Sequence, residues 1–172
     1  MYDEILLPVA PGNGANDAVG HAVSLAERYD ATVHVVSAAD TTDDTLAGPR
    51  TGAFSERLAD AAAERVEAVT TELEAAGVET VGSVVRCEPL EAIENAIDDG
   101  ADIVVMPSHT HRGIRRLLLG SVTEKVIRVA SVPVVTVPMD ESEAGEKGGN
   151  SDADGASEAA SDRDAGGASG IR

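Results

Sequence analysis

Positive charge in this acidic chain gathers in one short segment that also contains two histidines. Residues 109–116 hold two of the four histidines, His109 and His111, and three of the 11 arginines, Arg112, Arg115 and Arg116. Guanidinium groups bind phosphate through paired hydrogen bonds, and imidazole binds metal or moves protons. No third ligand stands at a recognisable metal-site spacing, so we expect an anion site here and no metal site. The competing interpretation is that these arginines only neutralise an acidic surface.

Gly120-Ser121 lies directly after this segment and before a pattern of helical period. A helix that begins here would direct the free N–H groups of Ser121, Val122 and Thr123 toward an anion, with the helix dipole behind them. The alternative is that Ser121 only caps its own helix, in a capping box with Glu124. The local sequence leaves both interpretations open, and the neighbouring bases favour the anion site.

Other candidate motifs in the chain are weaker. The Gly-Asn-Gly turn at 12–14 resembles the start of a dinucleotide-binding fingerprint, but Asp17 stands where a third small residue is needed. It is interpreted as a flexible turn whose amides could touch a ligand. His21 and His34 fall within a helix and a strand and are interpreted as structural. The sequence contains no G-x-S-x-G elbow and no P-loop, so we expect no catalytic residue and no enzymatic activity.

Short runs rich in Val, Ile and Leu alternate with helical patterns along the chain, which is typical of an α/β fold with a parallel sheet. The predicted strands are 4–9, 32–37, 79–86, 101–106 and 132–137. A doubly wound, five-stranded sheet of this kind takes the order 3-2-1-4-5 or 2-1-3-4-5 and binds ligands at the carboxyl ends of its strands. In the first order that crevice lies between strands one and four, between the loops at 10–15 and 107–120.

Four amphipathic helices are predicted between and beside these strands. The first, capped by Asn16 or Asp17, follows the first strand, and the longest runs over 53–76 with Phe54 on its inner face and a stop at Gly77. The third has Pro89 in its first turn. The fourth begins at Ser121 and is expected to bury four apolar residues, Val122, Val126, Ile127 and Ala130.

Composition separates a folded domain at 1–138 from a tail at 139–172. The tail is rich in Gly, Ser, Ala and Asp and carries a net charge of -6, which leaves -12 of the total of -18 on the rest of the chain. With almost no large apolar residue, such a segment cannot offset the entropy of ordering, so a disordered acidic tail is predicted.

The strong acidity bounds the surroundings and partners of the protein. A chain with 31 acids and only two lysines resembles proteins that stay soluble in concentrated salt, and it repels nucleic acids and anionic membranes. Cys87 is the only cysteine, which excludes an intrachain disulfide. No signal peptide and no long apolar run is evident, so a cytoplasmic protein that binds neither nucleic acid nor membrane is expected.

With the order of elements known, the chain resembles the universal stress protein family over residues 1–138. The segment LLLGSVTEKVIRVASVPVVTV at 117–137 is similar to the C-terminal signature of the family, and YDEILLPV at 2–9 and Glu88-Pro89 are similar to the corresponding segments. The resemblance implies the strand order 3-2-1-4-5. It also implies a homodimer formed through the fifth strand, here Val132 to Val137, where an unpaired Val-rich edge invites pairing.

The resemblance also implies a nucleotide pocket, and this sequence departs from the pattern of ATP-binding members in three places. Those members carry G-x-x-G, nine residues, then G-S or G-T after the fourth strand, together with an Asp after the first strand. Here Gly120-Ser121 is intact, but Pro107 and Thr110 replace the two earlier glycines and Ala10 replaces the Asp. Pro107 and Thr110 each add a Cβ, and Pro107 also removes an amide donor. Ala10 lacks the carboxylate that contacts the nucleotide, so the three replacements together imply a weakened or altered pocket.

The expected ligand-binding residues surround this pocket. They are Ala10, Pro11, Gly12, Met106, Pro107, Ser108, His109, Arg112, Gly113, Arg115, Gly120, Ser121 and Val122.

The function expected from the sequence is that of a non-catalytic, dimeric stress-response protein with a weakened or altered nucleotide or anion pocket, which acts through an unidentified protein partner. The alternative is an ATP-binding switch that uses Gly120-Ser121 with Arg112 or Arg115. No cofactor is required by the first hypothesis, although ATP or another nucleotide would suit the pocket. A slow nucleotide hydrolase with His109 or His111 as base is the least supported hypothesis, because no partner for such a base is evident.

Overall fold

The computed structural model describes residues 1–12, 17–39, 51–108 and 120–138. The basic segment at 109–116, which includes Thr110, and the predicted tail at 139–172 lie outside the described residues. The strands are β1 (Glu4–Pro8), β2 (Thr32–Ala38), β3 (Thr80–Val85), β4 (Ile103–Ser108) and β5 (Val134–Pro138). The helices are α1 (Asp17–Tyr29), α2 (Thr51–Ala75), α3 (Pro89–Asp98) and α4 (Ser121–Val129).

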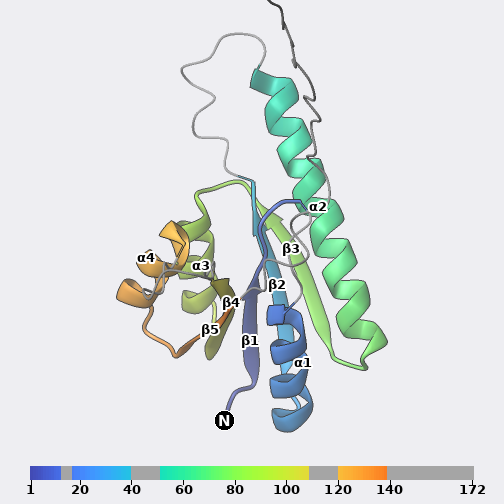
Figure 1. The fold of residues 1–172 in the computed structure, drawn as a ribbon, viewed down its shortest axis with the longest axis vertical. Coiled ribbons are helices and arrows are strands. Elements are labelled where there is room, and N and C mark those ends of the chain that lie inside the picture. Colours follow the sequence, from blue (N-terminus) through green and yellow to red (C-terminus); the bar gives the residue numbers. More distant parts are fainter. Residues whose placement is uncertain (13–16, 40–50, 109–119, 139–172) are drawn as a thin grey trace, which may run out of the picture.

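The five strands form one parallel sheet in the order β3-β2-β1-β4-β5. This is the predicted order, and it places the first strand of the chain at the centre of the sheet. Helices α1 and α2 cover one face, and α3 and α4 cover the other (Figure 1). The carboxyl ends of β1 and β4 therefore open onto the switch point between the two halves of the sheet, where an open α/β sheet binds ligands.

Alternate residues of the central strands supply the two cores. Ile5 and Leu7 of β1 pack toward α1 and α2, while Leu6 between them packs toward α3 and α4, and all three are fully buried. Because a strand turns successive side chains to opposite faces, a strand covered on both sides must be apolar throughout. Burial of each such side chain stabilises the fold by about 1.5–3 kcal/mol. The uninterrupted apolar run of β1 is thus explained by its central place.

Two predicted core residues are exposed instead. Phe54 is 68% exposed, because α2 has 25 residues, or about 37 Å, whereas its neighbour β3 has six, or about 20 Å. The first turns of α2 project past the sheet, as Figure 1 shows, and have no strand beneath them. Ile127 is 44% exposed, because the inward stripe of α4 consists of Thr123 and Val126 and leaves Ile127 at its margin.

Smaller features of the helices agree with the sequence. Pro89 is the first residue of α3 after the N-cap Glu88, and Gly77 adopts φ 82° just beyond the end of α2, a left-handed conformation that suits glycine at a helix stop.

The last two strands begin two residues later than predicted, so Pro107 belongs to β4. Beyond Val104, β4 pairs only with β5 among the described residues, and the missing N–H of Pro107 is tolerated there. None of the described helices is both long enough and apolar enough to cross a membrane.

Candidate functional site

A cavity of about 240 Å³ lies at the carboxyl ends of β1, β2 and β4. Its walls come from these strand ends, from the residues just after β1, and from the first turns of α3 and α4. The lining residues are Pro8, Val9, Ala10, Pro11, Val36, Ala38, Pro89, Ala92, Ile93, Met106, Pro107, Gly120, Ser121, Val122 and Thr123. The cavity therefore occupies the predicted crevice between strands one and four.

Apolar side chains form the floor of this cavity. Val36, Ala92, Ile93 and Met106 are buried there, and no described lining residue carries a charge. Such a surface favours a flat, weakly polar group such as a heterocyclic base, because burying it removes apolar area from water without stranding a charge. The polar side chains among the described lining residues are those of Ser121 and Thr123, both in the first turn of α4.

The beginning of α4 differs from the predicted capping box. The N-cap is Gly120, with φ -58° and ψ 153°, and no side chain caps the helix. Ser121 is instead the first helical residue, so its hydroxyl does not occupy the capping position that was expected. The first backbone hydrogen bond of the helix runs from the N–H of Glu124 to the carbonyl of Gly120, at 2.9 Å. Among the described residues, no side chain caps the preceding N–H groups, those of Ser121, Val122 and Thr123, so these groups can bind an anion.

Two buried hydroxyls fix the strand ends beside these donors. Thr123 Oγ1 donates to the carbonyl of Pro107 at 3.3 Å, and Ser108 Oγ donates to the carbonyl of Val137 at 3.4 Å. The first bond joins the end of β4 to the first turn of α4 and occupies the Pro107 carbonyl, while Pro107 has no N–H to offer. The residue at the first glycine position of the family pattern thus holds the pocket wall in place and supplies no amide donor to it.

The structure brings together seven of the predicted ligand-binding residues around the cavity, namely Ala10, Pro11, Met106, Pro107, Gly120, Ser121 and Val122. Two others that it describes do not line it. Ser108 is buried against β5 through its bond to Val137, and Gly12 is exposed with φ 93°. The remaining four, His109, Arg112, Gly113 and Arg115, lie outside the described residues.

Seven lining residues were missed by sequence reasoning: Pro8, Val9, Val36, Ala38, Pro89, Ala92 and Ile93. Thr123, which also lines the cavity, was expected only as a backbone N–H donor. Most of the seven are small or apolar and carry no recognisable motif. A signal was nevertheless present, because residues at the ends of strands one and two and at the start of the helix after strand three must meet at the same sheet edge. Polar motifs identify the rim of such a site, whereas strand order identifies its floor.

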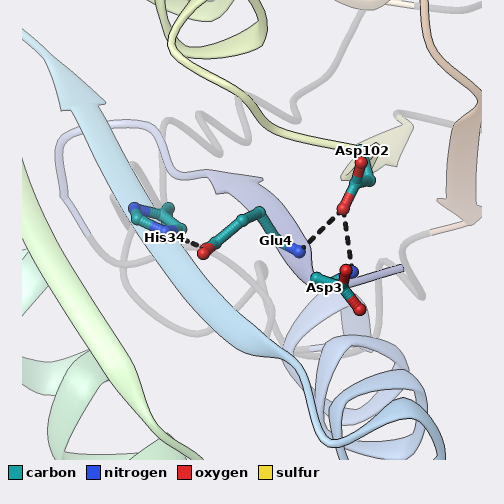
Figure 2. A network of polar contacts seen from close by, with 4 residues as sticks. All are labelled: Asp3, Glu4, His34 and Asp102. Atoms are coloured by element: carbon teal, nitrogen blue, oxygen red, sulfur yellow. Dashed lines mark hydrogen bonds and ion pairs between the residues drawn. The ribbon is translucent and has the colours of Figure 1, made fainter. Parts of the chain in front are cut away.

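A polar network lies at the opposite end of the sheet (Figure 2). One carboxylate oxygen of Asp102 accepts hydrogen bonds from the backbone N–H of Asp3 at 2.8 Å and of Glu4 at 3.0 Å. These bonds, the one from Asp3 first, stabilise the ionised form and lower the pKa of Asp102 below its ordinary value of 3.8. His34 is hydrogen-bonded through Nε2 to the Glu4 carboxylate, which agrees with its predicted structural role. Because this network is remote from the cavity, we assign it to the alignment of β1, β2 and β4.

Metal ligation has no support in the part of the chain that the structure describes, where no three His, Cys, Asp or Glu side chains come together.

Comparison with known proteins gives consistent results. A sequence model of the universal stress protein family matches residues 1–138. Universal stress protein MJ0531 of Methanocaldococcus jannaschii is 30% identical over 141 residues, which cover 80% of this chain and 82% of that protein. Among solved structures, that of MJ0577 from the same organism superposes with a TM-score of 0.66 at 28% identity and covers 81% of this chain and 98% of that one.

Two further structures with the same fold contain nucleotides. A universal stress protein in complex with cAMP has a TM-score of 0.59 at 21% identity, and covers 79% of this chain and 97% of that one. The universal stress protein from Archaeoglobus fulgidus in complex with dAMP has a TM-score of 0.56 at 21% identity, with 78% and 97% covered. At these identities the likeness to this chain is one of fold.

Proposed function

Because this chain belongs to the universal stress protein family, we propose that it is a non-catalytic, dimeric stress-response protein whose pocket binds a nucleotide with a single phosphate group. The observation that carries the proposal is the apolar cavity that ends at the uncapped N-terminus of α4. The base of the nucleotide would lie on the apolar floor. The phosphate would accept hydrogen bonds from the N–H groups of Ser121, Val122 and Thr123.

The volume of the cavity and its backbone N–H donors suit a nucleotide with one phosphate group. About 240 Å³ is below the range of roughly 300–1,000 Å³ that is usual for small-molecule sites. The helix N-terminus is a single group of donors, and Pro107 and Ala10 add no charged or N–H-bearing side chain beside it. That two proteins of this fold bind cAMP and dAMP, each with one phosphate, is in line with this choice.

A binding role, without catalysis, agrees with the described lining residues. The hydroxyl of Thr123 donates to the Pro107 carbonyl, and Ser121 has no acid or base beside it among the described lining residues. A nucleophile needs a neighbouring base within hydrogen-bond reach. The described walls of the cavity thus hold a ligand and offer no group to activate water.

The dimer would form through β5. In β4–β5 pairing, the carbonyl of Pro133 accepts from the N–H of Val104, so residues 133, 135 and 137 turn their backbone groups toward β4. The groups of Val134 and Thr136 then face the open edge of the sheet, where a second copy of β5 would find donors and acceptors.

Calorimetric titration in concentrated KCl tests the proposal. We expect AMP and cAMP to bind with a stoichiometry of one per chain, and ATP to bind no more tightly than AMP. Ser121→Ala should leave binding within about threefold, since a side chain hydroxyl contributes little beside three amide donors. Absence of binding by every nucleotide would refute the proposed pocket.

The ATP-binding switch remains the alternative, because three arginines precede Gly120 in the sequence and guanidinium groups suit additional phosphates. ATP affinity at least tenfold above that of AMP, lost in Arg112→Ala or Arg115→Ala, would favour the switch and refute the choice of a single-phosphate ligand.

A further inference from the structure

Strand β3 is an edge strand that lacks the usual protection against pairing. It is the outermost strand on its side of the sheet, and none of its six residues, TVGSVV, is charged or proline. Residues 81–84 are all exposed, with Val81 at 48% and Val84 at 37%. Natural edge strands are commonly blocked by charge, proline or a bulge. An uncharged, Val-containing edge is unexpected in a chain with a net charge of -18.

Half of the backbone groups of β3 point away from the sheet. Val33 donates its N–H to the carbonyl of Glu79, and Ala39 donates to the carbonyl of Val85, so the odd-numbered residues of β3 face β2. In a strand, the N–H and C=O of one residue point to the same side and neighbouring residues alternate. The backbone groups of Thr80, Gly82 and Val84 therefore face outward, and within the described ranges no further strand pairs with them.

A groove of about 350 Å³ lies between this edge and α2. Its floor is Gly82, where an added Cβ would come within 2.7 Å of Val66 Cγ1 and 2.9 Å of Thr70 Cγ2. The helix therefore rests directly on the strand at this point. Its rim carries the exposed carboxylates of Glu67 and Glu74, and no basic residue is among the described residues that line the groove.

We propose that β3 and this groove form a docking site for an extended, basic segment of a partner protein, which adds to the sheet as a sixth strand. The outward backbone groups supply the main-chain hydrogen bonds of strand addition. The two glutamates supply an attraction for Lys or Arg and would oppose a second copy of the same acidic edge. A basic segment is thus the occupant that both features fit.

The alternation of the strand specifies the pattern of the incoming segment. Even-numbered positions of β3, such as Val84, face α2, and odd-numbered positions, such as Val81, face the other side. An added strand alternates in the same way. Side chains on its α2 side would meet Glu67 and Glu74, while those on the other side would meet the exposed Val81. The preferred sequence therefore alternates basic and β-branched residues.

Fluorescence anisotropy tests the proposal with a labelled ten-residue peptide in which Lys and Val alternate. The control peptide has the same composition with the residues in pairs, Lys-Lys-Val-Val, which breaks the period. We expect the alternating peptide to bind the full-length chain at least fivefold more tightly than the control, and its affinity to fall as KCl is raised. Equal binding by both peptides, or no binding of either, would overturn the proposal.

Two pairs of variants locate the site. Val84→Pro removes an outward N–H and should weaken the alternating peptide roughly fivefold or more, the effect of one lost main-chain hydrogen bond, whereas Val84→Thr keeps the N–H and should bind as the parent does. Glu67→Gln with Glu74→Gln should weaken binding, whereas Glu56→Gln with Glu64→Gln, an equal change of charge outside the groove, should not. If circular dichroism shows that Val84→Pro does not fold, the comparison of the two double Glu→Gln variants decides. The proposal would be overturned if the two variants of the comparison that decides bound the alternating peptide with equal affinity.

Sedimentation velocity tests whether a second copy of this chain, in place of a basic partner segment, occupies the β3 edge. Under the proposal, Val84→Pro has the same mass in solution as Val84→Thr. A lower mass for Val84→Pro would show that a second copy occupies this edge, and the peptide proposal would then be wrong.

Discussion

Replacing Gly120 by Asp tests whether the N-terminus of α4 serves a ligand or only its own helix. Gly120 is the N-cap, and no side chain of the described residues accepts from the first N–H groups of the helix. Its φ of -58° is open to any residue, so a side chain here meets no backbone strain. A carboxylate at this position would accept those hydrogen bonds and place a negative charge where the phosphate is expected.

The two consequences of Gly120→Asp have opposite signs. Helix capping should raise the free energy of unfolding by a few tenths of a kcal/mol, since Asp is a somewhat better N-cap than Gly. Nucleotide binding should weaken, because two unit charges about 4 Å apart near a protein surface repel by about 4 kcal/mol. Concentrated salt screens part of this repulsion. If screening left a repulsion of only about 1.4 kcal/mol, the affinity for the nucleotide would still fall tenfold.

Calorimetric titration with AMP and urea denaturation measure these two effects on the same samples. Gly120→Asn is the matched control, since it caps as well as Asp but carries no charge. We expect AMP affinity to fall in the order parent, Asn variant, Asp variant, while both variants are at least as stable as the parent. Equal AMP affinity in all three proteins would refute the reasoning, because the α4 N-terminus would then not contact the phosphate.

Three other changes test the remaining parts of the structure. Asp102→Asn should lower the free energy of unfolding by about 0.5–1.5 kcal/mol at pH 7. Because the folded-state pKa of Asp102 is lowered below 3.8, the contribution of this carboxylate is present above about pH 4 and is lost as the pH falls through the lowered pKa. The free energies of unfolding of parent and variant, measured with urea, should therefore converge in acid. A difference between them that grew below pH 4 would contradict the assignment. Gly82→Ala should cost about 1–3 kcal/mol, because its Cβ overlaps Val66 and Thr70. An unchanged urea midpoint would show that α2 moves aside without cost. If the proposed dimer forms through β5, Thr136→Pro should convert it to a monomer in sedimentation velocity while Thr136→Val should not, and a dimer in both variants would exclude β5 as the interface.

The strand pattern was predictable because each strand obeys a local rule. The run at 5–8 in β1 is apolar at every position, as a strand covered on both faces requires. The order of the strands was not fixed by the residues alone, since 3-2-1-4-5 and 2-1-3-4-5 satisfy the same pattern. The resemblance of the 117–137 segment to the family signature selected the first order, and the structure has it.

The failed predictions share a dependence on long-range geometry. Phe54 has the helical spacing of a core residue, but its exposure follows from the different lengths of α2 and β3. Ser121 satisfies the capping-box pattern, yet it is the first residue of the helix and Gly120 is the N-cap. The apolar floor of the cavity arises from residues that have no motif and meet only through the strand order. Local sequence therefore identified the rim of the site and left its floor to the tertiary structure.

The hydrogen bonds of Asp102 have a consequence for the order in which the molecule assembles. They reach the N–H groups of Asp3 and Glu4 across 99 and 98 positions of the chain. During synthesis, β1, β2 and β3 can pair while β4 has yet to be made, and the other edge of β1 stays open until residue 102 is available. Contacts formed this late are absent from an early folding transition state. Asp102→Asn should accordingly speed unfolding and leave the folding rate unchanged. We therefore expect Asp102 to affect the lifetime of the folded protein more than the speed of its folding.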